Sequence, residues 1–183
     1  MSKDMLLPAM LLGQRRLPRG RTMTLAAILS AAIAPVTPAL AMPMGGHYTG
    51  HVDNQTPRPV GLNEVEIQQT ASGLNTGPGT PLDGAKVQWV ETVTLKNGRG
   101  PVRGTITFTT PSGATSSAYK GVATTDPQGR VTARGTYQVT HSTGDLAGVK
   151  GNGDFSVAYT SKADFTGEWR GEVQMPGQRS SKR

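Results

Sequence analysis

The chain has 183 residues, including 24 glycines and 13 prolines, and it has no cysteine. This length predicts one domain. Without cysteine, a disulfide-stapled domain, a cysteine zinc site and a thiol nucleophile are all excluded. Beyond the first 41 residues no apolar run is long enough for a transmembrane helix.

The formal net charge of +7 is concentrated in the N-terminal segment. Residues 1–41 hold five of the 19 basic side chains and one of the 12 acidic ones, which leaves a net charge of +3 for the rest. No run of Lys and Arg is interleaved with aromatic residues, so no nucleic-acid partner is expected. The last basic cluster lies in 177–183, which we interpret as a flexible tail.

Residues 1–41 have the pattern of a secretory signal peptide. A basic stretch at 15–21 precedes an apolar run at 23–33, and residues 39–41 form an A-x-A cleavage site. We expect cleavage after residue 41 and a mature chain, starting at Met42, that is periplasmic or secreted and not inserted in a membrane. The alternatives are an uncleaved membrane anchor and, from the paired arginines, a twin-arginine export route.

Residues 42–176 are expected to form one all-β domain. In 130–140, apolar or small side chains occupy the odd positions and polar ones the even positions, which predicts a strand with one buried face. Seven other segments rich in β-branched or aromatic residues are predicted as strands: 47–53, 62–70, 86–95, 103–109, 115–124, 153–160 and 164–173.

The connections between these strands favour a barrel. Short turns such as Asn97-Gly98 predict antiparallel neighbours, and the glycines and prolines of 76–81 predict a longer loop. Eight antiparallel strands can form a closed barrel or a sandwich. A barrel has no exposed edges, and glycines on apolar strand faces, such as Gly167 and Gly171, suit its curvature. We therefore predict an eight-stranded antiparallel β-barrel.

The stretch from 135 to 155 carries a family resemblance. A strand of the type G-x-Y-x-V leads there into a glycine-rich turn, STGDLAGVKGNG, and a further strand. This pattern resembles the signature of the allene oxide cyclase-like barrels, is similar to that of dirigent proteins, and looks closest to small bacterial barrel domains of unknown function.

The resemblance implies an eight-stranded antiparallel barrel with an apolar interior, often in a homo-oligomer. It implies no reaction. The plant cyclases act on a fatty-acid epoxide and dirigent proteins steer phenoxy-radical coupling, but neither active-site motif can be placed on this sequence. Gly144, Gly148, Gly151 and Gly153 allow positive φ and a tight turn, and Leu146 and Val149 can form an apolar plug under the barrel end.

The sequence gives little support for a metal site or for a serine nucleophile. His47 and His51 would lie on one strand face about 13 Å apart, too far to share a metal ion. No G-x-S-x-G nucleophile motif occurs. We therefore predict no metal site and no cofactor.

Glu91 is the residue with the strongest chemical signal. It falls in the middle of the apolar face that Trp89 and Val93 define on the strand at 86–95. A carboxyl pointing into the barrel would have a raised pKa or a partner, and Glu91 with Tyr137 is the candidate catalytic pair. The alternatives are a strand bulge and a satisfied internal hydrogen bond.

Eight aromatic side chains are assigned to inner faces, and most residues in such a set are core. A barrel of eight strands is either filled by side chains or holds one small ligand. If it holds one, the predicted ligand-binding residues are Trp89, Glu91, Phe108, Tyr119, Tyr137, Tyr159 and Trp169.

These observations predict an exported β-barrel that binds a small apolar ligand and is not obviously an enzyme. One alternative is a cyclase- or isomerase-like enzyme that acts on an apolar substrate in the cavity. Another is a structural module of the cell envelope, which requires no cavity.

Overall fold

The computed structural model describes residues 41–175. In chain order these residues form β1 (Ala41–Gly61), β2 (Glu64–Thr76), β3 (Lys86–Lys96), β4 (Arg99–Thr110), β5 (Gly113–Thr125), β6 (Val131–Ser142), the short 3-10 helix η1 (Gly144–Leu146), β7 (Lys150–Tyr159) and β8 (Asp164–Gln174).

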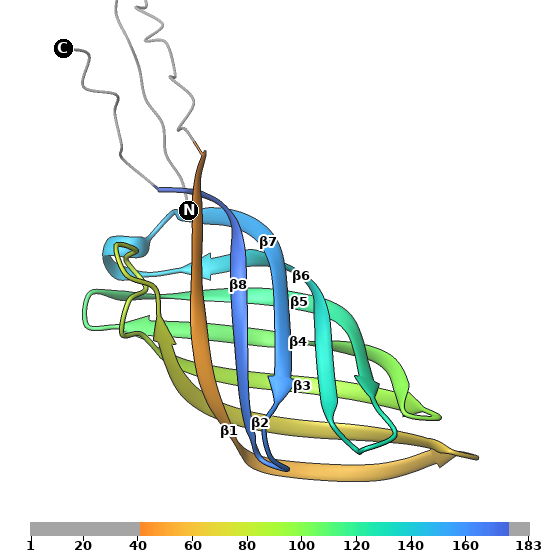
Figure 1. Ribbon diagram of the computed structural model, residues 1–183. Helices are drawn as coiled ribbons and strands as arrows, with labels where there is room; N and C mark the ends of the chain where they lie inside the picture. The colour runs from red at the N-terminus through yellow and green to blue at the C-terminus, as the bar shows by residue number, and fades with distance from the viewer. Residues whose placement is uncertain (1–40, 176–183) are drawn as a thin grey trace, which may run out of the picture. The chain divides into compact units, whose positions relative to one another are not determined.

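The eight strands close into a barrel, each antiparallel to the next, and β8 pairs with β1 to complete the ring (Figure 1). The prediction of an eight-stranded antiparallel barrel rather than a sandwich is therefore confirmed. Alternation of small or apolar and polar residues gives each strand an inner and an outer face, and the buried apolar side chains form the core inside the ring.

Strand β1 is much longer than predicted. The segment 47–53 covers only its middle, because β1 continues through Pro57 and Pro59 to Gly61. Pairing with β8 ends at His51, whereas pairing with β2 continues to Gly61. The two prolines thus lie where β1 has a neighbour on one side only, which is where strands tolerate the missing N–H.

The start of the second predicted strand was wrong by two residues. Leu62 and Asn63 form the turn between β1 and β2, and Asn63 has a φ of 55°. Asparagine adopts this left-handed conformation more readily than most residues. The Asn97-Gly98 turn between β3 and β4 has φ values of 51° and 78°, as a two-residue hairpin requires.

One end of the barrel is closed by an apolar plug, as predicted. Leu146 of η1 and Val149 are buried with Val173 of β8, and Leu82 from the β2–β3 loop packs against them. Figure 1 shows η1 and this loop side by side.

The β2–β3 loop is held in place by a buried hydrogen-bond relay. The indole of Trp169 donates to Asn75 over 2.9 Å, and the Asn75 amide donates to the Leu82 carbonyl over 2.7 Å. These two hydrogen bonds hold the loop so that Leu82 stays packed against the plug residues.

The glycine-rich turn behaves as expected in its first half only. Gly144 and Gly148 have φ values of 60° and 86°. Gly151 and Gly153 lie within β7 and do not have positive φ, so these two glycines do not use the freedom that the sequence allows them. The backbone of β8 packs closely there, because a Cβ on Gly153 would collide with the Arg170 carbonyl oxygen.

Two of the sequence predictions concern the ends of the chain. The predicted signal peptide, except for its last residue, and the predicted basic tail at 177–183 lie outside the described residues. Ala41 is the first residue of β1, and Met42 pairs with Val173 of β8. Within 41–175, no helix is long and apolar enough to cross a membrane.

Candidate ligand-binding cavity

The interior of the barrel contains a cavity of about 630 Å³ with a mainly apolar wall. At one end the cavity meets the plug residue Leu146. At the other end its wall includes exposed residues of two turns, Arg130 between β5 and β6 and Lys162 between β7 and β8. The cavity therefore opens to solvent at the end opposite the plug.

All seven predicted ligand-binding residues line this cavity. They come from six strands: Trp89 and Glu91 from β3, Phe108 from β4, Tyr119 from β5, Tyr137 from β6, Tyr159 from β7 and Trp169 from β8. Glu91 points inward, so the register assumed for its strand is correct.

Aromatic rings form much of the wall on one side of Glu91. Trp89 packs against Tyr48 and Phe165, with ring centroids 5.2 Å apart in both pairs. Tyr159 packs against Phe165 at the same centroid distance. Tilted and edge-on ring pairs at this separation contribute packing energy in addition to the burial of their apolar area. These contacts hold the rings of this wall in place.

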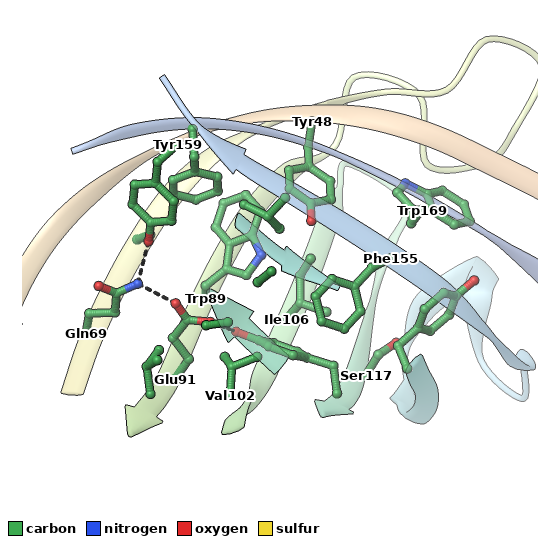
Figure 2. A pocket seen from close by; sticks show the side chains of 18 of the residues that line it. Tyr48, Gln69, Trp89, Glu91, Val102, Ile106, Ser117, Phe155, Tyr159 and Trp169 are labelled. Carbon is green, nitrogen blue, oxygen red and sulfur yellow. Dashed lines mark hydrogen bonds between the residues drawn. The ribbon is translucent and has the colours of Figure 1, made fainter. Parts of the chain in front are cut away.

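A hydrogen-bond network surrounds the Glu91 carboxyl (Figure 2). The Tyr119 hydroxyl donates to Glu91 Oε2, and the Gln69 amide Nε2 donates to Glu91 Oε1. The same nitrogen of Gln69 donates to the Tyr159 hydroxyl over 2.7 Å. Gln55 Nε2 donates to Gln69 Oε1 over 2.9 Å, which fixes the orientation of the Gln69 amide. Both carboxyl oxygens of Glu91 therefore accept a hydrogen bond from a neutral donor.

Strand register brings this network together. Glu91 pairs with Gln69 on one side and with Gly104 on the other, and Gly104 pairs with Tyr119. A Cβ on Gly104 would lie 2.7 Å from the Tyr119 hydroxyl and 2.7 Å from Glu91 Cβ. The glycine thus leaves the gap through which Tyr119 of β5 reaches Glu91 of β3 across β4.

Burial decides the protonation behaviour of the site. Burial raises the pKa of Glu91 above its usual value, and the hydrogen bonds from Tyr119 and Gln69 counteract only part of this. Burial also raises the pKa of Tyr159 to about 12 and those of Tyr119 and Tyr48 well above the usual range. The tyrosines therefore stay neutral, and Glu91 is the one carboxyl of this network, with a pKa above its usual value.

Tyr137 lies in a different part of the wall. Its ring packs edge-on against Trp169 with centroids 6.3 Å apart, and its hydroxyl is buried without a hydrogen-bond partner among the described residues. A Cβ on Gly171 would lie 2.5 Å from this hydroxyl. Burial raises the pKa of Tyr137 to about 12. Glu91 and Tyr137 both face the cavity, but the hydrogen-bond partners of Glu91 are Tyr119 and Gln69.

Sequence reasoning missed Gln69, Gln55 and Tyr48 at this site. Gln69 follows Val65 and Ile67 in the same alternation that singled out Glu91, so it carried a readable signal. Tyr48 alternates with Gly46 and Gly50. Because glycine has no side chain, this alternation does not show which face of the strand is apolar. Gln55 follows a bulge in β1 between Val52 and Asn54, which shifts the alternation and hides its orientation.

The histidines that were considered as metal ligands lie outside the cavity. His51 Nδ1 is 2.7 Å from Asp164 Oδ1 at the start of β8, and both side chains are exposed. His47 is exposed as well. Within the described part of the chain, no three His, Asp or Glu side chains are grouped to hold a metal ion.

The fold and the cavity define an eight-stranded antiparallel β-barrel with an inward-facing, half-buried carboxyl in a mainly apolar interior. No family model and no curated protein sequence matches the chain. Two solved structures, both of pterocarpan synthase dirigent proteins, are similar to it. One is 11% identical, with 74% of this chain and 95% of that chain covered and a TM-score of 0.43. The other is 14% identical, with 81% and 99% covered and a TM-score of 0.43.

The likeness to these two structures concerns the barrel fold alone. The family resemblance of the sequence, to allene oxide cyclase-like barrels, dirigent proteins and small bacterial barrel domains, stays a prediction.

Proposed function

We propose that this protein binds a small, largely apolar molecule inside the barrel, with a polar group of that molecule facing Glu91. One observation carries the proposal. The cavity of about 630 Å³ has a mainly apolar wall, and the Glu91 network places hydrogen-bonding groups at one point of it. Small-molecule sites are typically pre-formed, mainly apolar cavities in which a few polar groups point toward the ligand.

The test is binding of a neutral aromatic probe, 1-naphthylmethanol, measured by isothermal titration calorimetry on the full chain. Ala123 lines the cavity from the inner face of β5, and Ala118 is exposed on the outer face of the same strand. We expect Ala123→Leu to weaken binding by at least about tenfold, because the added side chain enters the cavity. Ala118→Leu is the matched control and should leave binding unchanged. Equal effects of the two substitutions, or no binding by the wild type, would overturn the proposal.

The natural ligand can be sought by native mass spectrometry of the purified chain. An adduct mass above the bare protomer supports the binding function and identifies the compound, and the same spectrum reports the homo-oligomeric state. The structural cell-envelope module requires no cavity, so the observed cavity favours the binding function over it.

The enzyme alternative is favoured by the inward position of Glu91 and its raised pKa, because a carboxyl that holds its proton to a higher pH than usual is suited to general acid or base chemistry. Chromatography of the compounds that co-purify with the wild type and with Glu91→Gln separates the two functions. Different isomers of one mass in the two extracts support an isomerase or cyclase. The same compound in both supports a carrier.

Export is the second element of the proposal and rests on the signal-peptide pattern of residues 1–41. We expect the protein recovered from the periplasm or the medium of a producing bacterium to begin at Met42. N-terminal sequencing measures this directly. An intact N-terminus on a membrane-bound protein would support the anchor instead.

A further inference from the structure

The Glu91 carboxyl is the one acidic group on the cavity wall. Of the described residues that line the cavity, Glu91 has the one carboxyl, Arg130 and Lys162 have the cationic side chains, and four tyrosines have phenols. Arg130 and Lys162 lie in exposed turns at the open end, and Arg130 is paired with Asp126 over 2.6 Å. Within residues 41–175, no Lys, Arg or His lies within ion-pair distance of Glu91.

Glu91 is half-buried. A carboxylate that is largely removed from bulk water is costly without a cation, and folded proteins ordinarily pair such a charge. The donors around Glu91 are arranged for a carboxylate nonetheless. Gln55 holds the Gln69 amide so that its NH₂ group faces Glu91, and Tyr119 donates from the other side. An ionised carboxylate has about four acceptor positions, so these two bonds leave capacity for further donors.

The surface beside Glu91 is aromatic. Trp89 lies two residues away on the same face of β3, and Tyr48 and Tyr159 lie on either side of it in Figure 2. Tyr159 shares a donor, Gln69 Nε2, with Glu91. Aromatic faces attract organic cations through their quadrupole, most strongly where water is excluded.

We propose that the ligand of this barrel is an organic amine: an apolar body that carries one protonated nitrogen, which pairs with Glu91 and lies against the Trp89, Tyr48 and Tyr159 rings. This inference rests on the proposed binding function and specifies its ligand class. The ammonium group supplies the cation that the protein itself does not place at Glu91. It also donates to the acceptor positions that Gln69 and Tyr119 leave free.

The test compares two probes with one skeleton, 1-naphthylmethylamine and 1-naphthylmethanol, by calorimetry at pH 7.5 on the full chain. The amine is protonated at this pH and the alcohol is neutral. We expect the wild type to bind the amine at least about tenfold more tightly than the alcohol. Glu91→Gln should bind both probes equally. Glu168→Gln, which removes an exposed carboxylate of β8, is the control and should retain the preference.

A second measurement needs no variant. The preference of the wild type for the amine should disappear as the pH is lowered through the raised pKa of Glu91, while binding of the alcohol persists. The other titratable groups facing Glu91 are Tyr119 of β5, Tyr159 of β7 and Tyr48 of β1, and all three stay neutral over this range. The cationic groups on the cavity wall are Lys162 and Arg130 at the open end, and Arg130 is paired with Asp126.

The outcomes distinguish a failure of the amine proposal from a failure of the proposed apolar-ligand binding. Equal binding of the two probes by the wild type, or a preference that survives in Glu91→Gln, overturns the amine proposal and leaves the apolar-ligand function standing. Failure of both probes to bind overturns both.

Discussion

The hydroxyl of Tyr119 on β5 donates a hydrogen bond to the carboxyl of Glu91 on β3, across the whole width of strand β4. Neighbouring strands are about 4.8 Å apart, so two residues on alternate strands touch only when the residue between them is small. In this barrel that residue is Gly104. The position of the polar group inside the cavity therefore depends on one missing side chain.

Gly104→Ala should destabilise the protein by about 1–3 kcal/mol, because a Cβ there meets the Val90 carbonyl oxygen at 2.5 Å and the Tyr119 hydroxyl at 2.7 Å. Urea denaturation measures the change in the free energy of unfolding. Gly61→Ala is the control, since a Cβ there would lie 3.2 Å from the end of the flexible Glu64 side chain. Equal losses in the two variants would contradict the role given to Gly104.

Tyr119→Phe should raise the pKa of Glu91 further, because the hydrogen bond from Tyr119 is the larger of the two that lower it. It should also cost about 1–3 kcal/mol of stability, since a buried carboxyl loses a donor. A ¹³C NMR titration of the Glu91 carboxyl measures the pKa. Tyr137→Phe removes a hydroxyl that has no partner within the described part of the chain, so the Glu91 titration should not move in this control.

The stability of the wild type should fall as the pH rises from about 4.5 through the raised pKa of Glu91, relative to Glu91→Gln. The sign follows from the direction of the shift. The folded state holds the Glu91 proton more tightly than the unfolded state, whose usual value is 4.5. It therefore gains stability at low pH, and this contribution is lost as the proton leaves.

The size of this pH effect is about 1.4 kcal/mol for each unit by which the pKa is raised. Denaturation at several pH values measures it. Glu168→Gln should parallel the wild type. A difference between the wild type and Glu91→Gln that does not change with pH would mean that Glu91 is not perturbed by folding.

Leu146→Ala should destabilise the barrel by about 2–5 kcal/mol, the usual cost of truncating a buried leucine. The Leu146 side chain is 3% exposed in the plug, whereas Leu74 on the outer face of β2 is 56% exposed. Leu74→Ala is therefore the matched control, with an expected change of at most about 0.5 kcal/mol. Thermal unfolding compares the two variants. A small effect of Leu146→Ala would show that the plug does not contribute to the barrel's stability.

Much of the fold could be predicted because its determinants are local. Alternation along each strand, as in Val87, Trp89, Glu91 and Val93, shows which side chains share a face whatever the partner strand is. Turn residues with a defined backbone preference, such as Asn97-Gly98, locate the reversals. Strand alternation and hairpin turns together predict eight antiparallel strands and the inward direction of Glu91.

The partners of Glu91 depend on information that is not local. Which residue of β2 lies beside Glu91, and which residue of β5 reaches it, depend on the register of three strand pairs around the ring. A shift of one residue would turn Gln69 or Tyr119 to the outer face. That register depends on packing over the whole barrel. The sequence by itself determined the strands, their faces and the buried carboxyl, and only the tertiary structure decided that the interior is open and that Gln69 and Tyr119 converge on Glu91.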